Sequence, residues 1–162
     1  MYLTFLGLFL KYIVMEEKIL FFCDAKGIEP RKATIGSAAF DVFLPEDLQI
    51  NLMQLKTIDT GVKFKMPPNH LGLLTVRSSA AMKGVILLGG LLDSDFTQNI
   101  KLLLSSIAVG PLHFTAGESV AQISFIPIST VSLARAQHAH DIPDTVHKGF
   151  GSTSEKPILL SD

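Results

Sequence analysis

Several features that would point to particular classes of protein are scarce in this sequence of 162 residues. A single cysteine, Cys23, cannot form an internal disulfide, which predicts a reducing compartment, cytoplasmic or nuclear, for a protein encoded by a cell or a virus. Cys23 follows an apolar run, so we expect a packed thiol rather than a nucleophile. The net charge of −1 provides no field to attract nucleic acid, so we expect no polynucleotide partner.

A hydrophobic run long enough to span a membrane is also missing. Residues 1–14 are almost wholly apolar, but a span needs about 20 such residues, and no basic leading region or small-residue cleavage site accompanies them. We therefore expect no membrane partner. The composition changes again near residue 137, after which little can pack into a core. The predicted organisation is an apolar N-terminal extension at 1–17, a domain at 18–136 and a flexible C-terminal arm at 137–162.

The sequence contains no long amphipathic helix and no internal repeat. Short apolar or alternating runs are separated by turn signals, and this pattern predicts an all-β sandwich or barrel. One brief helix is predicted at 79–83, between a serine and a glycine. The mean hydropathy of +0.38 favours an apolar interface in addition to a core. The predicted strands are residues 19–23, 48–52, 60–66, 71–76, 85–92, 100–109, 112–114 and 119–128.

The most informative segment connects two of these strands. Asp93-Ser94-Asp95-Phe96 lies between two apolar runs, in the pattern of a β-hairpin whose tip can present a carboxylate to a ligand. Taken alone, these residues would be read as turn chemistry, because Asp and Ser side chains bond their own backbone. Four further segments stand in a fixed order around it: Ala38-Ala39-Phe40-Asp41-Val42, Val76-Arg77-Ser78-Ser79-Ala80-Ala81, Gly117-Glu118-Ser119-Val120-Ala121-Gln122-Ile123 and Lys148-Gly149-Phe150-Gly151-Ser152-Thr153-Ser154.

In order and approximate spacing, the five segments resemble the five motifs of the trimeric dUTP diphosphatases (dUTPases). The resemblance extends over residues 18–154 and implies a β-barrel or jelly-roll of short strands, with one short helix and a mobile C-terminal arm. It also implies hydrolysis of dUTP to dUMP and pyrophosphate, Mg²⁺ as cofactor, and a homotrimer with shared active sites. Asp93 matches the family's water-activating aspartate, and Asp41 matches the aspartate that holds magnesium through water.

The resemblance assigns phosphate contacts to two motifs. Arg77 and Ser78 match the phosphate-binding pair, for which the planar donor fork of arginine is well suited. Ser79 stands where the family usually has glycine. Gln122 matches a glutamine that hydrogen-bonds near the α-phosphate and the attacking water, whereas Ser119 takes a position that is often basic.

The hairpin implies recognition of the nucleoside. In the family, uracil is read mainly by main-chain groups of this hairpin, which here contains Gly90. Phe96 replaces a tyrosine whose ring packs against the deoxyribose, and phenylalanine keeps that face. Thr97 and Gln98 replace the usual Arg or Gln followed by Gly, and Gln takes a positive φ less readily than Gly.

The last motif resembles the family's closing arm, whose aromatic ring stacks on uracil while glycine amides approach the phosphates. An arginine usual a few residues before that ring is absent, and a lysine offers charge without the bidentate fork. The arm residues implied to contact substrate are Lys148, Phe150, Gly151, Ser152 and Thr153.

The sequence therefore predicts a Mg²⁺-dependent dUTP diphosphatase. The altered motif positions motivate one alternative, a catalytically impaired dUTPase-fold protein that acts as a nucleotide-binding or protein-interaction module. A related dCTP deaminase is the third reading, prompted by Arg77-Ser78-Ser79, but the hairpin and the arm fit a dUTPase better.

Overall fold

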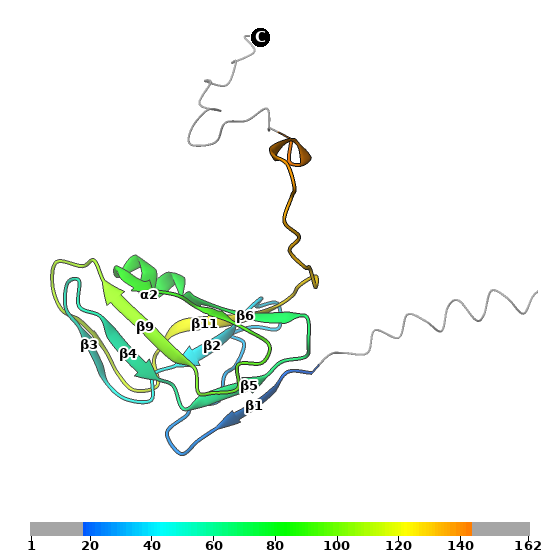
Figure 1. Ribbon diagram of the computed structural model, residues 1–162. Helices are drawn as coiled ribbons and strands as arrows, with labels where there is room; N and C mark the ends of the chain where they lie inside the picture. Colours follow the sequence, from blue (N-terminus) through cyan, green and yellow to red (C-terminus); the bar gives the residue numbers. More distant parts are fainter. Residues whose placement is uncertain (1–17, 144–162) are drawn as a thin grey trace, which may run out of the picture. The chain divides into compact units, whose positions relative to one another are not determined.

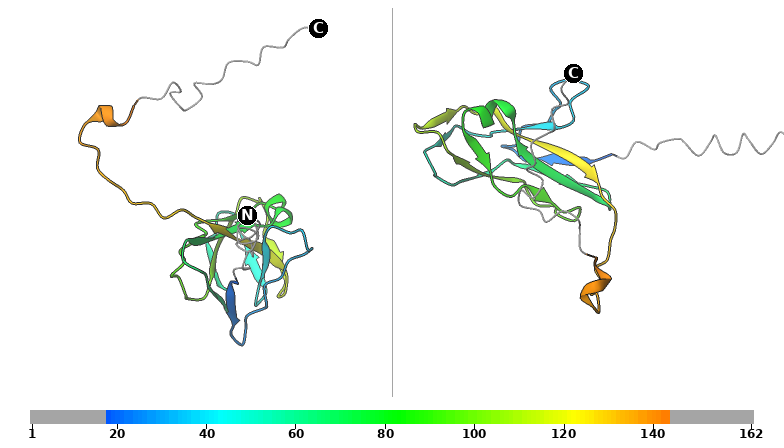
Figure 2. Two further views of the ribbon diagram at one scale, coloured as in Figure 1. Left: turned by 90° about the vertical axis from the view of Figure 1, so that its right-hand side faces the viewer. Right: turned by 90° about the horizontal axis from the view of Figure 1, so that it is seen from above.

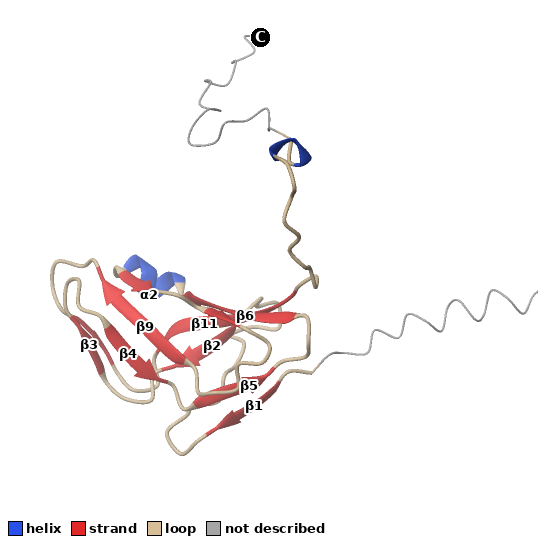
Figure 3. Ribbon diagram, in the orientation of Figure 1, coloured by secondary structure: helices blue, strands red, loops and turns tan. Residues whose placement is uncertain are grey.

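The computed structural model describes residues 18–143, and the chain divides into two units between Ser129 and Thr130. Between residues 18 and 129 the first unit is nearly all-β, as predicted, with one five-residue helix, α2 (Ser78–Met82) (Figures 1 and 3). Its strands are β1 (Leu20–Cys23), β2 (Phe40–Phe43), β3 (Leu48–Ile50), β4 (Lys56–Asp59), β5 (Val62–Lys65), β6 (His70–Val76), β7 (Val85–Leu87), β8 (Leu91–Leu92), β9 (Lys101–Ser106), β10 (Leu112–Phe114) and β11 (Ser119–Pro127).

These strands form two main layers. One is a four-stranded sheet in the order β2-β11-β6-β8, and the other is a three-stranded sheet in the order β4-β9-β7; every pairing is antiparallel. Two smaller pairs, β1-β5 and β10-β3, complete the unit. The views in Figures 1 and 2 place β4 and β9 on one side and β2, β11 and β6 on the other.

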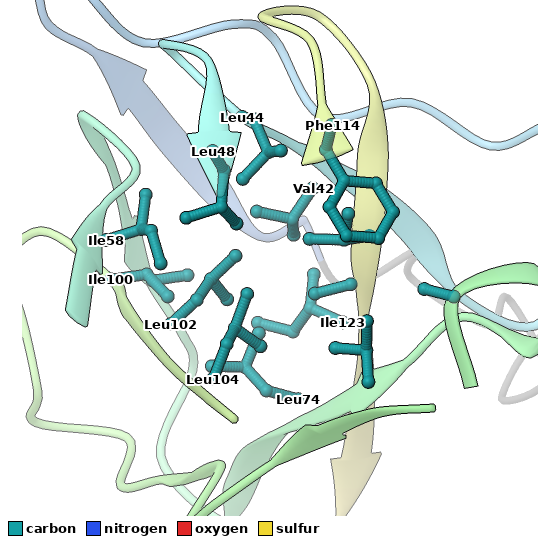
Figure 4. Packing of buried hydrophobic residues seen from close by; sticks show 14 of the residues in the cluster. Val42, Leu44, Leu48, Ile58, Leu74, Ile100, Leu102, Leu104, Phe114 and Ile123 are labelled. Carbon is teal, nitrogen blue, oxygen red and sulfur yellow. The ribbon is translucent and has the colours of Figure 1, made fainter. Parts of the chain in front are cut away.

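The core lies between these layers (Figure 4). Leu102 and Leu104 of β9 alternate with more exposed neighbours and are fully buried, as expected for a strand with one face in the core. They meet Ile123 of β11 and Val42 of β2 from the opposite layer. Burial of one such side chain contributes about 1.5–3 kcal/mol, so this row stabilises the contact between the two sheets.

The predicted strand at 85–92 is interrupted. Gly89 and Gly90 have φ angles of 71° and 107°, in the left-handed region that favours glycine, and they divide the run into β7 and β8. β7 pairs with β9, whereas β8 pairs with β6 in the other sheet. A Cβ on Gly90 would lie 2.6 Å from the carbonyl oxygen of Leu74, so glycine also permits this close approach.

Two strands were missing from the sequence prediction. β4 carries only one large apolar side chain, Ile58, and β2 was recognised only as part of a motif. The predicted helix at 79–83 is confirmed with its bounds one residue earlier. Of the other predicted strands, 112–114 has the bounds of β10, 71–76 begins one residue earlier in β6, and the rest are shorter in the structure.

The second unit is described as far as residue 143. Its one regular element there is a 3₁₀ turn, η2 (Ala139–Asp141), whose start is capped by Asp141, because Asp141 Oδ2 accepts from the backbone amides of Gln137 and His138. None of the helices between residues 18 and 143 has the length and apolar character that crossing a membrane requires.

Candidate functional site

A row of polar side chains crosses three neighbouring strands of the four-stranded sheet. Gln122 on β11 is paired in register with Asp41 on β2 and with Thr75 on β6. Directly opposite residues project to the same face, with Cβ atoms about 4.5–5.5 Å apart. Their chain neighbours Val42 and Ile123 are fully buried in the core, so the polar row lies on the outer face of the sheet.

An open cleft of about 340 Å³ lies beside this row. Arg77 enters it from the residue after β6, and Ser78, the first residue of α2, follows. The remaining walls are small or hydroxylated side chains, which leave room for a ligand. The cleft is lined by Ala33, Ser37, Ala38, Ala39, Asp41, Arg77, Ser78, Gln122 and Ser124.

Arg77 and Asp41 form an ion pair within the cleft. The Nε atom of Arg77 lies 3.1 Å from Oδ1 of Asp41, and Nη1 donates a weak hydrogen bond of 3.4 Å to the carbonyl oxygen of Ser119. A guanidinium has five N–H donors, so these two interactions leave three for an anion. The pair also holds the Asp41 carboxylate with one oxygen engaged and the other able to accept from water.

Gln122 is anchored by the neighbouring strand. Its Nε2 atom donates to Oγ1 of Thr75 at 3.2 Å, and both side chains are half-buried. Thr75 was not among the site residues predicted from the sequence. The available signal was a polar residue directly after the apolar run at 71–74 and two positions before Arg77, a spacing that puts both on one face.

The serine at the usually basic position 119 has a structural role here. Ser119 lies at a register shift between β11 and β2, and its hydroxyl lies 3.0 Å from both the carbonyl of Val42 and that of Ala121. Its side chain therefore supports the irregular strand edge, and its carbonyl supports Arg77. Serine does not supply the positive charge that a basic residue would bring to this position.

The predicted hairpin tip is a tight turn away from the cleft. The amide of Phe96 donates to the carbonyl of Asp93 at 3.1 Å, which closes the turn. Asp93 and Phe96 are exposed. Gln98 does not have a positive φ, so replacement of the usual glycine is accommodated without left-handed strain.

Asp93 and the cleft lie toward opposite ends of β6. Leu92 is paired with Gly72, five residues before Arg77, and the antiparallel direction carries Asp93 further away. At about 3.3 Å per residue, the separation along the strand is on the order of 15–20 Å. One chain thus brings Asp41, Arg77 and Gln122 together and leaves Asp93 elsewhere.

The other predicted site residues fall outside this cleft. Ser79 is exposed on α2, and Gly90 fixes the base of the hairpin through its carbonyl, which accepts from the amide of Leu74 at 2.7 Å. The arm residues, Lys148, Phe150, Gly151, Ser152 and Thr153, lie outside the described residues.

A larger cleft, of about 430 Å³, lies at the exposed edge formed by β1 and β5. Phe21 and Phe22 line it, and Thr97 and Gln98 at the end of the hairpin connection reach it. It is lined by Lys63 and Lys65 but by no arginine and no carboxylate, so it lacks the combination of a bidentate donor fork and a metal-ligating oxygen that the smaller cleft has.

The thiol of Cys23 bears on whether the protein has a cysteine nucleophile. Burial, helped by the nearby carboxylates of Glu29 and Asp24, raises the pKa of the Cys23 thiol, which supports a packed thiol rather than a nucleophile.

Across residues 18–143, no group of three or more His, Cys, Asp or Glu side chains is arranged to hold a metal ion. A single carboxylate, Asp41, is sufficient for Mg²⁺ only if waters and phosphates supply the other ligands, and the donor set fits that mode.

Fold and cleft together define an all-β protein with a polar site suited to a phosphorylated ligand. The dUTPase family model matches residues 25–154, and the chain belongs to the dUTPase family. The deoxyuridine 5'-triphosphate nucleotidohydrolase of fowlpox virus is 30% identical over 145 residues, covering 88% of this chain and 100% of the viral protein. The Pol polyprotein of equine infectious anemia virus is 30% identical over 128 residues, 79% of this chain, and the chain spans 11% of that polyprotein's length.

Solved structures share the fold. The dUTPase of Staphylococcus bacteriophage 80alpha with dUPNHPP has a TM-score of 0.76 at 20% identity, covering 83% of this chain and 97% of the phage chain. A mutant dUTPase from phage phi11 of S. aureus, described with a coordinated structural Mg(II) ion, has a TM-score of 0.70 at 19% identity, covering 75% and 98%.

Proposed function

We propose that this protein hydrolyses dUTP to dUMP and pyrophosphate, and that it does so as a homotrimer with shared active sites. The observation that carries the proposal is the grouping of Asp41, Arg77 and Gln122 in one cleft, at positions that match three family motifs. Family membership and the fowlpox nucleotidohydrolase support the reaction. The phage 80alpha dUTPase with its bound dUPNHPP supports the class of substrate.

The residues of the cleft are suited to separate tasks. Arg77 has three N–H donors beyond those engaged with Asp41 and Ser119, and these can bind phosphate oxygens. Gln122 is held beside them and can orient a water molecule toward the α-phosphorus. Asp93, brought from another chain, takes the proton from that water as general base. Catalysis of this kind depends on positioning and on compensation of charge.

Asp41 is the residue that would hold Mg²⁺ through water. Its Oδ1 is engaged by Arg77, so Oδ2 is the oxygen suited to accept from a metal-bound water. When bound, the ion would offset the negative charge of the triphosphate, which provides the direct ligands. A dUTPase of this fold, from phage phi11, is described with a structural Mg(II) ion.

A second copy of the chain is needed to complete the site. Asp93 lies roughly 15–20 Å along β6 from Arg77, too far for both to serve one phosphate within a chain. Large apolar side chains are exposed on the hairpin and on the adjoining segment after β9, and such a surface favours self-association. These residues are Ile86, Leu88, Leu91, Ile107 and Val109. The family resemblance adds the arm of a third chain.

The test is turnover of dUTP with Mg²⁺, followed as release of dUMP and pyrophosphate, with dCTP and UTP as control substrates. We expect dUMP from the wild-type protein and its loss in the Asp93→Asn variant, which keeps the size of the side chain and removes the base. Asp95→Asn, at the other aspartate of the same turn, is the matched control and should retain activity. Absence of turnover at high protein concentration would contradict the proposal, and dUTP binding without turnover would favour the catalytically impaired alternative.

A further inference from the structure

We propose that Arg31 is a second phosphate-binding arginine of the cleft, acting from the side opposite to Arg77. This inference rests on the proposed function of the same site. Arg31 belongs to none of the five sequence motifs, but it forms an antiparallel bridge with Asp41, whose amide donates to the Arg31 carbonyl oxygen at 2.8 Å. Directly opposite residues project to the same face of a sheet, so Arg31 extends the polar row beyond Asp41.

An aromatic ring holds the Arg31 side chain over the sheet. The guanidinium carbon lies 5.0 Å from the centroid of the Phe43 ring, which is a cation–π contact. Phe43 follows Asp41 by two residues on β2 and therefore lies on the same outer face. It is only 6% exposed, although it is not part of the core cluster. The stem of Arg31 thus helps to cover Phe43, and its charged group extends along β2 rather than away from the sheet.

Arg77 approaches the same region from the other edge of the cleft. Its Nε atom pairs with Asp41 on β2, so its side chain crosses β11. Three strand spacings of about 4.8 Å, roughly 14 Å in all, separate the backbone of β6 from that of the Arg31 segment. Both long side chains lean inward over this span. Asp41 therefore lies between two arginines, and a phosphorylated ligand in the cleft would have a guanidinium on either side.

The position of Arg31 also bears on the serine at position 119. Ser119 is paired with Phe43, so the Arg31 guanidinium stacks on the residue directly opposite this usually basic position. Arg31 can thus supply, from a neighbouring strand edge, the positive charge that serine lacks. Within residues 18–143 no carboxylate forms an ion pair with Arg31, so in this part of the chain its N–H donors are not engaged by an acid.

Removal of the charge alone tests this role. Arg31→Met keeps most of the stem that covers Phe43 and removes the guanidinium. The probe is dUPNHPP with Mg²⁺, and its dissociation constant is measured by isothermal titration calorimetry. We expect binding to weaken by about threefold to tenfold, the range for a charge-assisted contact at an exposed site, and Arg31→Lys to retain most of the affinity.

The neighbouring lysine provides a matched control. The ammonium of Lys32 lies 5.2 Å from the ring of Phe40, which packs against the core cluster on the other face of β2. Lys32→Met removes the same charge and should leave the affinity for dUPNHPP nearly unchanged. The difference between the two methionine variants should shrink as NaCl is raised to about 0.5 M, because salt screens exposed charges.

Moving the charge separates phosphate binding from a structural role. In the Arg31→Met background, Ser119→Arg places a guanidinium opposite Phe43 and should recover much of the lost affinity, whereas Ser119→Gln should not. The melting temperature of each variant, measured without nucleotide, shows whether packing on Phe43 has been damaged. A loss of affinity that follows the melting temperature rather than the charge would overturn the role.

The remaining outcomes separate this inference from the proposed function. No dUMP from a wild-type protein that binds dUPNHPP overturns the proposed hydrolysis, while the Arg31→Met comparison still decides the role of Arg31. Wild-type turnover with unchanged dUPNHPP affinity in Arg31→Met overturns the role of Arg31 alone. Equal weakening by Lys32→Met also overturns it, since net charge rather than a contact would then be responsible. Absence of dUPNHPP binding by the wild-type protein overturns both.

Discussion

Two inactive variants of this protein should restore activity to each other when they assemble together. Asp93→Asn removes the proposed base, and Arg77→Ala removes the guanidinium from the cleft. If each site takes its hairpin from one chain and its cleft from another, a mixed assembly contains sites with both groups intact. The prediction depends on the placement of Asp93 and Arg77 at opposite ends of β6, on the order of 15–20 Å apart.

The size of the recovery follows from the arrangement. In a cyclic homo-oligomer every interface is the same, so each site pairs one hairpin with one cleft from a different chain. With equal amounts of the two variants and random assembly, half of the hairpins carry Asp93 and half of the clefts carry Arg77. The two conditions are independent, and about a quarter of the sites should be complete. Recovery should therefore approach about a quarter of the wild-type rate.

The assay is co-expression of the two variants with different affinity tags, two-step purification of mixed assemblies, and measurement of dUMP release. Selecting for both tags removes the pure assemblies and raises the recovery somewhat above the random value. Each variant alone, purified in the same way, provides the baseline. Recovery no greater than that baseline, in assemblies shown to contain both variants, would refute the shared site and require both residues of a site to come from one chain.

Two further predictions concern the hairpin and its support. Phe96→Ala should raise kcat/KM for UTP relative to dUTP by on the order of tenfold, because the ring face that excludes a 2′-hydroxyl is lost; Phe96→Tyr should preserve discrimination, and an unchanged ratio in the alanine variant would contradict this role. The pKa of Asp24 is lowered chiefly by the backbone amide of Lys26, and that of Asp59 chiefly by the backbone amide of Gly61, while Asn99 donates to both carboxylates. The pKa values of both carboxyl groups are lower in the folded state than in the unfolded state, so their ionised forms stabilise the fold. This stabilisation is present above about pH 4 and is lost as the pH falls through the folded-state pKa values. Asn99→Ala should therefore make the fall of melting temperature with decreasing pH shallower. An unchanged dependence of melting temperature on pH would argue against a contribution of the Asn99 hydrogen bonds to the two lowered pKa values.

Much of the fold could be predicted from hydrophobic patterning. The alternation of β5 and the apolar runs of β6, β9 and β11 identify strands with one face in a core. β4 was not predicted because its single large apolar side chain, Ile58, shows no alternation of apolar and polar residues. The division of the run at 85–92 was also missed, although the paired glycines were visible. Their positive φ angles and the close approach of Gly90 to Leu74 depend on which sheet each half joins, and patterning alone does not decide that.

For the site, residue types were easier to predict than their spatial grouping. The family resemblance identified Asp41, Arg77 and Gln122, and the structure brings these three to one cleft. Thr75 was overlooked because its contribution depends on strand register, which places it directly opposite Gln122. The commitment of Ser119 to backbone carbonyls depends on a local register shift and was equally invisible in the sequence.

The anchoring of the hairpin explains why the proposed division of the site between chains could not be relieved by motion within one chain. Gly90 accepts a hydrogen bond of 2.7 Å from the amide of Leu74, in the second half of β6, and Leu91 and Leu92 continue the pairing toward its start. To reach Arg77 of its own chain, Asp93 would have to break this pairing and reverse the direction of β8. Anchoring of the hairpin thus keeps Asp93 away from Arg77 of its own chain, and in the proposed assembly it would fix how far the Asp93 carboxylate extends toward a neighbouring cleft. Residues at the base of the hairpin are therefore expected to influence catalysis in the adjacent subunit.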